Sequence, residues 1–219
     1  MVTNIYVYNP QPGGETGFQA DAFLNVGKVS IKDSKYGSDI NLNLSWFSGS
    51  GTSSGLISFG NDYFRDASIE WKKKWNKQLK TTLQVQYLYY NKSVIEGGLH
   101  DNITAGTVAI NTIYNFTETG SLHFELQHLY TENDLKNWAA TLVEVSFAPK
   151  WSFFVSDLYN YGKTDIHYPN VGGYYSAGGS RFGLSYGRQR AGLYCLGGVC
   201  RYVPAATGLT ITFITTFNQ

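Results

Sequence analysis

The sequence predicts an all-β protein: a transmembrane antiparallel up-and-down β-barrel of about twelve strands, or the C-terminal part of a larger one. Three observations predict this class. Apolar and polar residues alternate with a period of two along the chain, the predicted strands are long, and aromatic residues gather toward both strand ends. The 219 residues are expected to form a single domain, 1–219.

The alternation defines the strands. Apolar residues at Ile40, Leu42 and Leu44 alternate with Asn41 and Asn43, and the same pattern recurs in most other segments. The predicted strands are 2–9, 16–27, 37–48, 64–75, 78–92, 103–116, 120–131, 137–148, 150–161, 167–177, 180–191 and 206–217. Within 150–161, the face that carries Trp151 also carries Asp157, and the sequence leaves open a β-bulge that would switch the faces.

Strand length and connection length both favour a membrane barrel. Many predicted strands have the roughly 9–11 residues that a membrane crossing needs, whereas an ordinary globular strand has about five or six. Short turns alternate with longer polar links near 49–63, 92–102, 132–136, 162–166 and 192–205, as periplasmic turns alternate with outer loops. The 28–36 link fits this pattern less well, because it is rather long for a periplasmic turn.

Two sets of residues follow from the barrel interpretation. Polar residues on the alternating face are expected to line the lumen, and aromatic residues near the strand ends are expected at the membrane interfaces. The lumen-facing candidates are Gln19, Asp21, Asn41, Asn43, Gln84, Gln86, His123 and Glu125. The interface candidates are Trp46, Trp71, Trp75, Tyr87, Tyr89, Trp151 and Phe217.

Composition and charge exclude several classes. Hydrophobic residues make up 42% of the chain, so disorder is not expected, yet no apolar run approaches the roughly 20 residues of a membrane-spanning helix. The net charge of +1 gives no global field for nucleic acid, and the Lys72–Lys74 run is interpreted as a solvated strand end. No signal peptide is visible at Met1, so an outer-membrane location requires a mature chain or a fragment.

No constellation predicts catalysis, a metal or a cofactor, and the protein is not expected to be an enzyme. His123 and His128 are five residues apart, whereas two zinc-binding histidines on a helix need a spacing of four. On a strand, His123 and Glu125 share a face while His128 points away. A membrane-embedded hydrolase remains a third hypothesis, and the residues it would use lie in or beside outer links: Ser50, Ser53, His100, Asp101 and His167.

The two cysteines, Cys195 and Cys200, enclose a Leu-Gly-Gly-Val turn. In an oxidising compartment, two cysteines that flank a tight loop are expected to form a local disulfide. Free thiols remain the alternative. A metal site would need further ligands, and no histidine lies nearby in the sequence.

The C-terminal third carries a family resemblance. The runs Tyr186–Gly192 and Cys195–Ala205, the latter with the pattern CxGGVCRxVPA, together with Gly17–Asp21 upstream, resemble an uncharacterised family of Bacteroidota outer-membrane proteins. This resemblance implies a location in the outer membrane of a Gram-negative bacterium, and it brings no activity or catalytic residues. Chains of that family are longer, which implies that this sequence is a C-terminal portion. Asn218 and Gln219 follow the terminal aromatic Phe217, a departure from the usual barrel ending.

The first functional hypothesis is therefore an outer-membrane barrel that serves as a pore or as a structural subunit of an envelope assembly. Its expected partners are the lipid bilayer with lipopolysaccharide, other envelope proteins, or missing strands of its own chain, and not nucleic acid. The alternative is a soluble or surface β-sandwich that binds glycans through exposed aromatic residues. The sequence leaves open whether the lumen is open or plugged.

Overall fold

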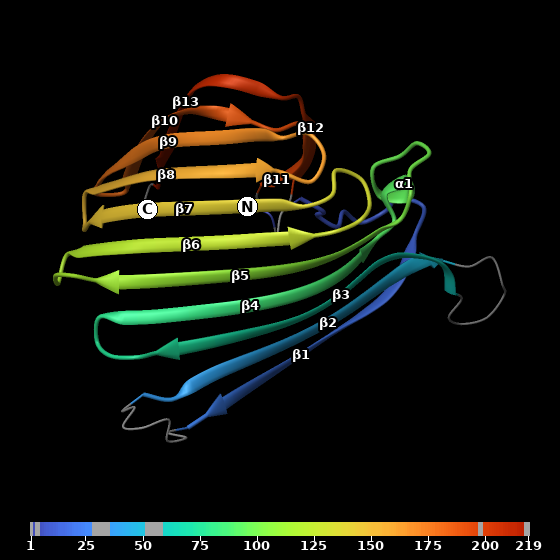
Figure 1. Cartoon of the computed structure of the whole chain (residues 1–219), viewed down its shortest axis with the longest axis horizontal. Coiled ribbons are helices and arrows are strands. Elements are labelled where there is room, and N and C mark those ends of the chain that lie inside the picture. Colours follow the sequence, from blue (N-terminus) through green and yellow to red (C-terminus); the bar gives the residue numbers. More distant parts are fainter. Residues whose placement is uncertain (1, 3–4, 28–35, 51–58, 197–198, 217–219) are drawn as a thin grey trace.

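The fold is one large, curved antiparallel sheet (Figure 1). The computed structural model describes residues 2, 5–27, 36–50, 59–196 and 199–216. Eleven strands form the sheet in the order β1-β2-β3-β4-β5-β6-β7-β8-β9-β10-β13. Their bounds are β1 Glu15–Val26, β2 Ser38–Ser50, β3 Phe59–Lys74, β4 Leu79–Tyr90, β5 Ile103–Asn115, β6 Gly120–Tyr130, β7 Trp138–Phe147, β8 Trp151–Asn160, β9 Ile166–Ala177, β10 Ser180–Gln189 and β13 Ala206–Thr215.

Connection length differs between the two ends of the sheet. At one end, called here the short-turn end, tight turns join β3 to β4, β5 to β6, β7 to β8 and β9 to β10. Gly178 lies in the last of these turns with a φ of 56°, a conformation that glycine adopts without strain. At the other end, the long-loop end, the connections contain the short helix α1 (Lys92–Ile95) and a separate hairpin of β11 (Gly192–Leu196) and β12 (Val199–Val203).

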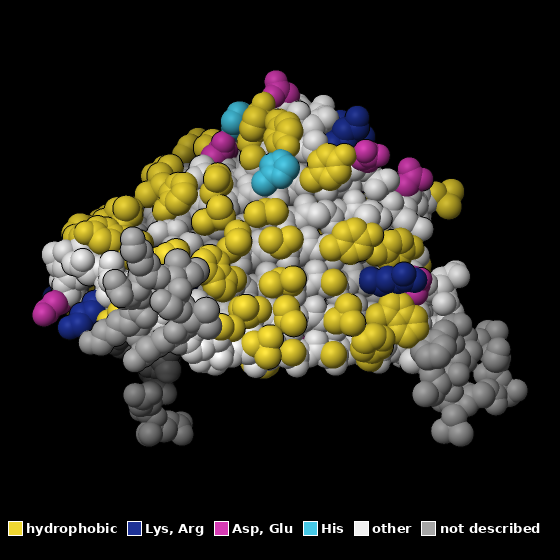
Figure 2. Space-filling model, turned by 60° about the horizontal axis from the view of Figure 1, so that its bottom comes forward, with side chains coloured by type: hydrophobic (Ala, Val, Ile, Leu, Met, Phe, Trp, Pro, Cys, Tyr) yellow, Lys and Arg dark blue, Asp and Glu magenta, His cyan; other side chains and the backbone are white. Residues whose placement is uncertain are grey.

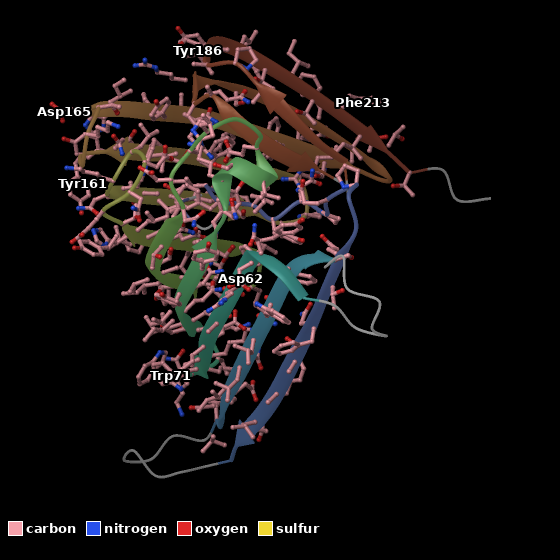
Figure 3. The ribbon with its side chains drawn as sticks, turned by 90° about the vertical axis from the view of Figure 1, so that its right-hand side faces the viewer. Asp62, Trp71, Tyr161, Asp165, Tyr186 and Phe213 are labelled. Carbon is pink, nitrogen blue, oxygen red and sulfur yellow. The ribbon has the colours of Figure 1, made fainter. Side chains whose placement is uncertain are left out.

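The predicted up-and-down antiparallel order is confirmed, but the sheet is not closed into a barrel. Each described neighbour pair from β1 to β13 is antiparallel, and β1 and β13 are the two free edges. Eleven strands, rather than about twelve, belong to this sheet, and β11 and β12 lie inside the predicted 192–205 link. Figure 3 shows the sheet as an open curve with a concave and a convex side.

The predicted strand 2–9 is wrong. Residues 5–9 carry no strand and lie instead as irregular chain against the concave side of the sheet. Ile5 and Tyr6 are adjacent in sequence, yet both are buried, at 6% and 4% exposure. In a strand with one exposed face, only every second residue would be buried. Ile5 and Tyr6 are instead both packed against the protein, which is incompatible with such a strand.

The bulge considered for β8 is absent. The pairing of β8 with β7 and with β9 is unbroken from Trp151 to Asn160. Asp157 therefore keeps the face of Phe153 and Val155, which is the convex face. There it binds His167 of β9, with 2.5 Å between its Oδ2 atom and Nδ1 of the histidine.

The buried core is small and lies in the long-loop half of the concave side. The residues that form it come from the N-terminal segment, α1 and the central strands: Val2, Ile5, Tyr6, Leu88, Tyr90, Ile95, Ile103, Ala105, Leu129, Trp138 and Ala140. Within the described part of the chain, no helix has the length and hydrophobicity required to cross a membrane.

Two leucines of β6 allow this buried core to be compared with the opposite, exposed face. Leu129 is 1% exposed on the concave side, whereas Leu126 is 46% exposed on the convex side. We expect Leu129→Ala to lower the free energy of unfolding by about 2–5 kcal/mol, because it leaves a cavity, and Leu126→Ala to cost clearly less. Denaturant unfolding in detergent micelles measures both; equal losses would contradict this location of the core.

Candidate functional site: a polar concave face behind an apolar convex face

The strand pairing assigns every strand side chain to one of two faces. In β4, Leu83, Val85 and Tyr87 point to the convex face, and Gln84 and Gln86 point to the concave face. The same alternation continues through the neighbouring strands, because each register is antiparallel and, apart from two shifts near Ser48, unbroken.

The convex face is apolar and exposed (Figure 2). Large hydrophobic side chains follow one another across neighbouring strands, from Leu44 and Ile69 to Val85 and onward to Val155 and Ile211. Their exposures lie between 47% and 64%. Soluble monomers rarely expose contiguous apolar patches larger than a few hundred Å². The convex face therefore differs from the surface of a typical soluble monomer.

Charged side chains on the convex face lie toward its margins. In the described strands they are Asp62, Arg65, Lys73, Asp157 and Arg188. On β3, Arg65 and Lys73 are separated by eight residues, or ~26 Å along the strand at ~3.3 Å per residue. Only Ala67, Ile69 and Trp71 lie between them on this face. Figure 2 shows the charged groups near the edges of the hydrophobic surface.

Aromatic side chains flank this apolar band at both ends. At the short-turn end, Trp71 packs edge-on against Trp75 with ring centroids 6.2 Å apart, and Trp151 contacts Tyr175 at 4.6 Å. Of the other predicted interface residues, Trp46, Tyr87 and Tyr89 lie toward the long-loop end of the convex face. Phe217 lies outside the described residues.

Polar aromatic contacts mark the long-loop margin. The Tyr159 ring stacks on the His167 ring with centroids 3.8 Å apart, and the Tyr159 hydroxyl donates to Asp165 at 2.5 Å. His128 lies on the same face and contacts the Tyr161 hydroxyl at 2.5 Å. Figure 3 shows Tyr161 and Asp165 together at this end of the sheet.

The concave face is polar in its short-turn half. All eight residues expected to face a lumen lie on it. Several of them form hydrogen bonds across strands with one another or with further polar residues of this face: Asn43 donates to Asp21 at 2.6 Å, Asn41 to Glu70 at 2.7 Å, Gln86 to Asp66 at 2.8 Å, and Asn111 to Glu125 at 3.3 Å. His123 lies 3.8 Å from the Glu125 carboxylate on this face.

A hollow of about 280 Å³ lies over β3 to β6 on this polar surface. Its lining combines carboxylates, amides and one amine: Glu70, Lys80, Thr82, Gln84, Ala109, Asn111, Ile113, Glu125 and Gln127. The amide and carboxylate side chains are donors and acceptors of hydrogen bonds, and such a surface is suited to water and to hydrated solutes.

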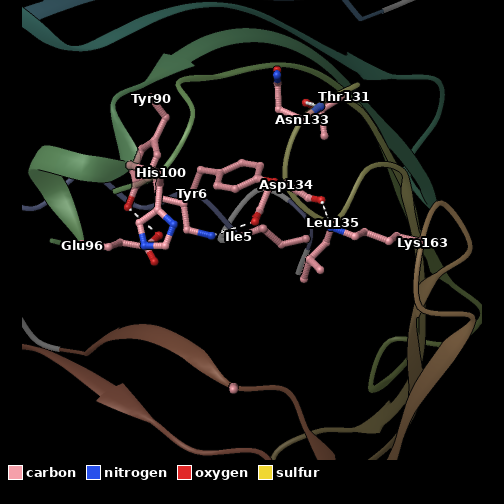
Figure 4. Close-up of polar contacts among 12 residues, drawn as sticks. Ile5, Tyr6, Tyr90, Glu96, His100, Thr131, Asn133, Asp134, Leu135 and Lys163 are labelled. Carbon is pink, nitrogen blue, oxygen red and sulfur yellow. Dashed lines mark hydrogen bonds and ion pairs between the residues drawn. The ribbon is translucent and has the colours of Figure 1, made fainter. Parts of the chain in front are cut away.

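The N-terminal segment covers the long-loop half of the concave face. The backbone N–H of Val2 donates to Oε1 of Gln127 at 2.6 Å, and the Tyr6 hydroxyl donates to Asp134 at 3.3 Å. Arg190, which directly follows β10, donates to the Ile5 carbonyl at 3.3 Å. Figure 4 shows Ile5 and Tyr6 beside Asp134. The segment therefore spans the concavity between distant strands.

Loop residues brace this segment. Lys92 of α1 and Asp134 of the β6–β7 loop form an ion pair of 2.7 Å beside Tyr6. Burial, followed by the nearby Asp134 carboxylate, raises the pKa of Tyr6 above its usual range. Burial and the Glu15 carboxylate raise the pKa of Tyr8 in the same direction. Both tyrosines are thus neutral hydrogen-bond donors at physiological pH.

Sequence reasoning missed this segment as part of the site. Ile5-Tyr6-Val7-Tyr8 has the β-branched and aromatic residues of a strand, which led to the strand prediction. Residues 5–8 lack the polar residue at every second position that is found in most strands of the sheet. That difference was the available signal, together with Pro10 and Pro12, which end the run.

The predicted disulfide is not shown. The backbones of Cys195 and Cys200 face each other as paired residues of the β11–β12 hairpin. Their side chains lie outside the described set, and no disulfide is found in the part of the chain that is described. The bond therefore stays a prediction.

The contacts of the described hydrolase candidates do not link a serine to a histidine ring as a catalytic relay requires. Ser93, which was not among the predicted candidates, donates a hydrogen bond to the backbone carbonyl of His100 at 2.7 Å. The imidazole ring of His100 takes no part in this bond. The His167 ring contacts Asp157. Ser53 lies outside the described residues. Across the described chain, no group of three or more His, Cys, Asp or Glu residues is placed to hold a metal.

The fold and its two faces define a class: an all-β protein with one large, open antiparallel sheet that is mainly apolar on its convex face and polar on half of its concave face. A family model matches residues 1–217, and the chain belongs to this family of unknown function, DUF6029. The expectation of an uncharacterised family is thereby confirmed, whereas the Bacteroidota origin stays a prediction. No curated protein matches the chain.

Proposed function

We propose that this chain forms part of an outer-membrane β-barrel whose polar interior is a pore narrowed at the long-loop end by residues 2 and 5–14. The observation that carries the proposal is the inverted polarity of the sheet. A Val, Leu, Ile or Phe side chain gains about 1.5–3 kcal/mol when it leaves water, and the convex face presents many such side chains. Lipid is a solvent that would cover all of them at once.

The backbone supports the same proposal. In hydrocarbon every N–H and C=O group must be paired within the protein, and strands satisfy this only in a sheet whose ladders are complete. The nine inner strands are paired on both sides, with 10 to 16 residues each. Such strands have the length of membrane crossings, which need about 9–11 residues.

The aromatic and charged margins fit the two interfaces of a bilayer. Tryptophan and tyrosine prefer the headgroup region, where the ring is apolar and one edge can donate a hydrogen bond. Trp46 illustrates this, since its Nε1 atom donates to Asp62 at 2.7 Å at the long-loop margin. Lipopolysaccharide on the long-loop side is the partner proposed for this margin, in line with outer loops that face the cell exterior.

The glycan-binding β-sandwich loses its architectural basis. A sandwich needs two sheets packed face to face over an apolar interior. The described strands form one large sheet and a small hairpin, and the apolar face is the exposed one. Glycan binding by exposed aromatic side chains and hydrolysis by loop residues both remain alternative proposals.

A structural subunit of an envelope assembly is the second candidate function. It is favoured by the core beneath the N-terminal segment, where Trp138 and Tyr90 are fully buried. A barrel filled there would conduct poorly. The polar hollow in the other half favours the pore, so conductance separates the two.

Two neighbouring residues of β4 test the contact with lipid. We expect Val85→Arg, on the convex face, to reduce the stability of the sheet in a bilayer by about 2–4 kcal/mol, because it places a charge in hydrocarbon. Gln84→Arg, on the concave face, should have little effect. Unfolding in lipid vesicles, followed by the heat-dependent shift on gels, measures both. An unchanged stability of Val85→Arg would contradict lipid contact. Val85 is 47% exposed, so an arginine there would be tolerated if the convex face were in water.

The narrowing segment can be removed without touching a strand. In the complete barrel, we expect deletion of residues 1–13 to raise single-channel conductance in planar bilayers, because β1 begins only at Glu15 and the concave face would be uncovered. Ion selectivity should respond to Lys80→Glu, inside the polar hollow, and not to Tyr87→Phe on the convex face. An unchanged, negligible conductance after the deletion would support the structural subunit.

A further inference from the structure

The two free edges of the sheet cannot pair with each other in an antiparallel manner. The sheet has eleven strands, and each runs opposite to its neighbour, so the first and the last run in the same direction. β1 starts at the long-loop end, where Glu15 faces Gly49, and β13 also starts there, where Ala206 faces Gln189. Direct closure would therefore create a parallel seam.

The edges carry few of the features that protect a free edge from pairing: β13 has none of them, and β1 has only the acidic residues Glu15 and Asp21. Natural edge strands are interrupted by prolines, lysines or bulges. β13 has the sequence ATGLTITFIT, with no charge and no proline, and its register with β10 is unbroken. β1 contains neither proline nor lysine, and its register with β2 is likewise unbroken.

Exposure points to a missing neighbour on both faces of these strands. β1 is exposed at nine consecutive residues from Gly17 to Asn25, where a strand such as β5 alternates buried and exposed positions. On β13, Leu209, Ile211 and Phe213 are 63–67% exposed on the convex face, and Ile214 is 56% exposed on the concave one. Both the backbone and the side chains of these strands therefore lack a neighbour on the outer side within the described sheet.

We propose that an odd number of further strands, supplied by polypeptide outside residues 1–219, completes the sheet between β13 and β1. The strands that pair with β1 and with β13 must each run from the short-turn end to the long-loop end. Any odd number satisfies both edges and makes the total even, as in single-chain bacterial barrels. The added strands must be apolar on the convex side and polar on the concave side.

A second copy of this chain does not meet the requirement. Two copies inserted in the same direction are related by rotation about the membrane normal, which leaves the strand directions unchanged. β13 of one copy would then meet β1 of the other in a parallel pair. Pairing β1 with β1 would be antiparallel, but one copy would stand upside down in the bilayer with its long loops on the opposite side.

The position of residues 2 and 5–14 agrees with strands that precede β1 in the same polypeptide. The strand that pairs with β1 must finish at the long-loop end, and this segment lies at that end, next to the start of β1. A connection from that strand through the segment into β1 would not have to cross the bilayer. The segment would then be a loop folded into the lumen, as in barrels whose interior is plugged by loops.

The test uses the 219-residue chain alone, folded in detergent micelles. Cysteine pairs are introduced in a Cys195→Ser, Cys200→Ser background. Ala22→Cys on β1 is combined in turn with Leu209→Cys, Ile211→Cys or Phe213→Cys on β13, so that several registers are sampled. The matched control combines Ala22→Cys with Leu42→Cys, which are direct partners in the β1–β2 pairing.

We expect the control disulfide to form and none of the β1–β13 disulfides to form. Hydrogen exchange should be about tenfold faster or more at the β1 and β13 amides than at those of β5 and β6, because one side of each edge is unpaired. An intramolecular β1–β13 disulfide with slow exchange would show closure through a parallel seam and overturn the proposal. An intermolecular β1–β13 disulfide would show that a second copy completes the sheet, which overturns it equally.

This inference rests on the proposed function, and the two fail differently. A chain that purifies from aqueous extract without detergent would remove the membrane proposal itself. A chain that inserts into bilayers and forms the β1–β13 disulfide would leave the membrane proposal standing and remove only the additional strands.

Discussion

The structure depends on the ladder of backbone hydrogen bonds that runs unbroken across most of the sheet. This ladder fixes which side chains share a face, because a one-residue slip would move every apolar residue to the concave side. It also replaces a hydrophobic interior as the main organising element. The buried core is confined to one half of the concave face, and most large apolar side chains lie outside it.

A sheet of this polarity makes its solvent part of the fold. In water, the exposed apolar side chains of the convex face would raise the free energy of the folded protein, and the unpaired edges β1 and β13 would favour aggregation. In lipid, the same face would be stabilised, while the polar network of Asp21, Asn43, Glu70 and their neighbours would stay hydrated on the other side. The proposed location follows from this asymmetry, and not from any single residue.

The N-terminal segment changes how the concave side is understood. A polar lumen alone would favour a wide pore, but Val2, Ile5 and Tyr6 cover its long-loop half and connect β6, the β6–β7 loop and Arg190. These contacts combine hydrogen bonds to backbone and side chains with buried aromatic rings, next to the ion pair between Lys92 and Asp134. The segment is therefore held by several independent interactions, which suits a fixed constriction.

Most of the strands could be predicted from sequence because their signal is local. From β1 to β10 and in β13, polar residues at every second position located each strand end to within five residues, including β8, where Asp157 lies on the apolar face beside His167. The segment at 5–9 could not be predicted in the same way, because its partners are distant in sequence. Missing strands were expected from the family resemblance and remain a proposal, whereas the odd number that we propose for them could not be predicted. That parity depends on an exact strand count, and the sequence pattern counts residues 2–9 as a strand.

Spin labels placed at successive positions from Lys80 to Tyr89 of β4, in lipid vesicles, test the central claim most directly. We expect oxygen, which concentrates in lipid, to relax the labels at 83, 85 and 87 most strongly, and a water-soluble nickel chelate to relax those at 82, 84 and 86. The two accessibilities should alternate with a period of two and opposite phase. Equal access of the nickel chelate to both sets would contradict the account, because the convex face would then be in water.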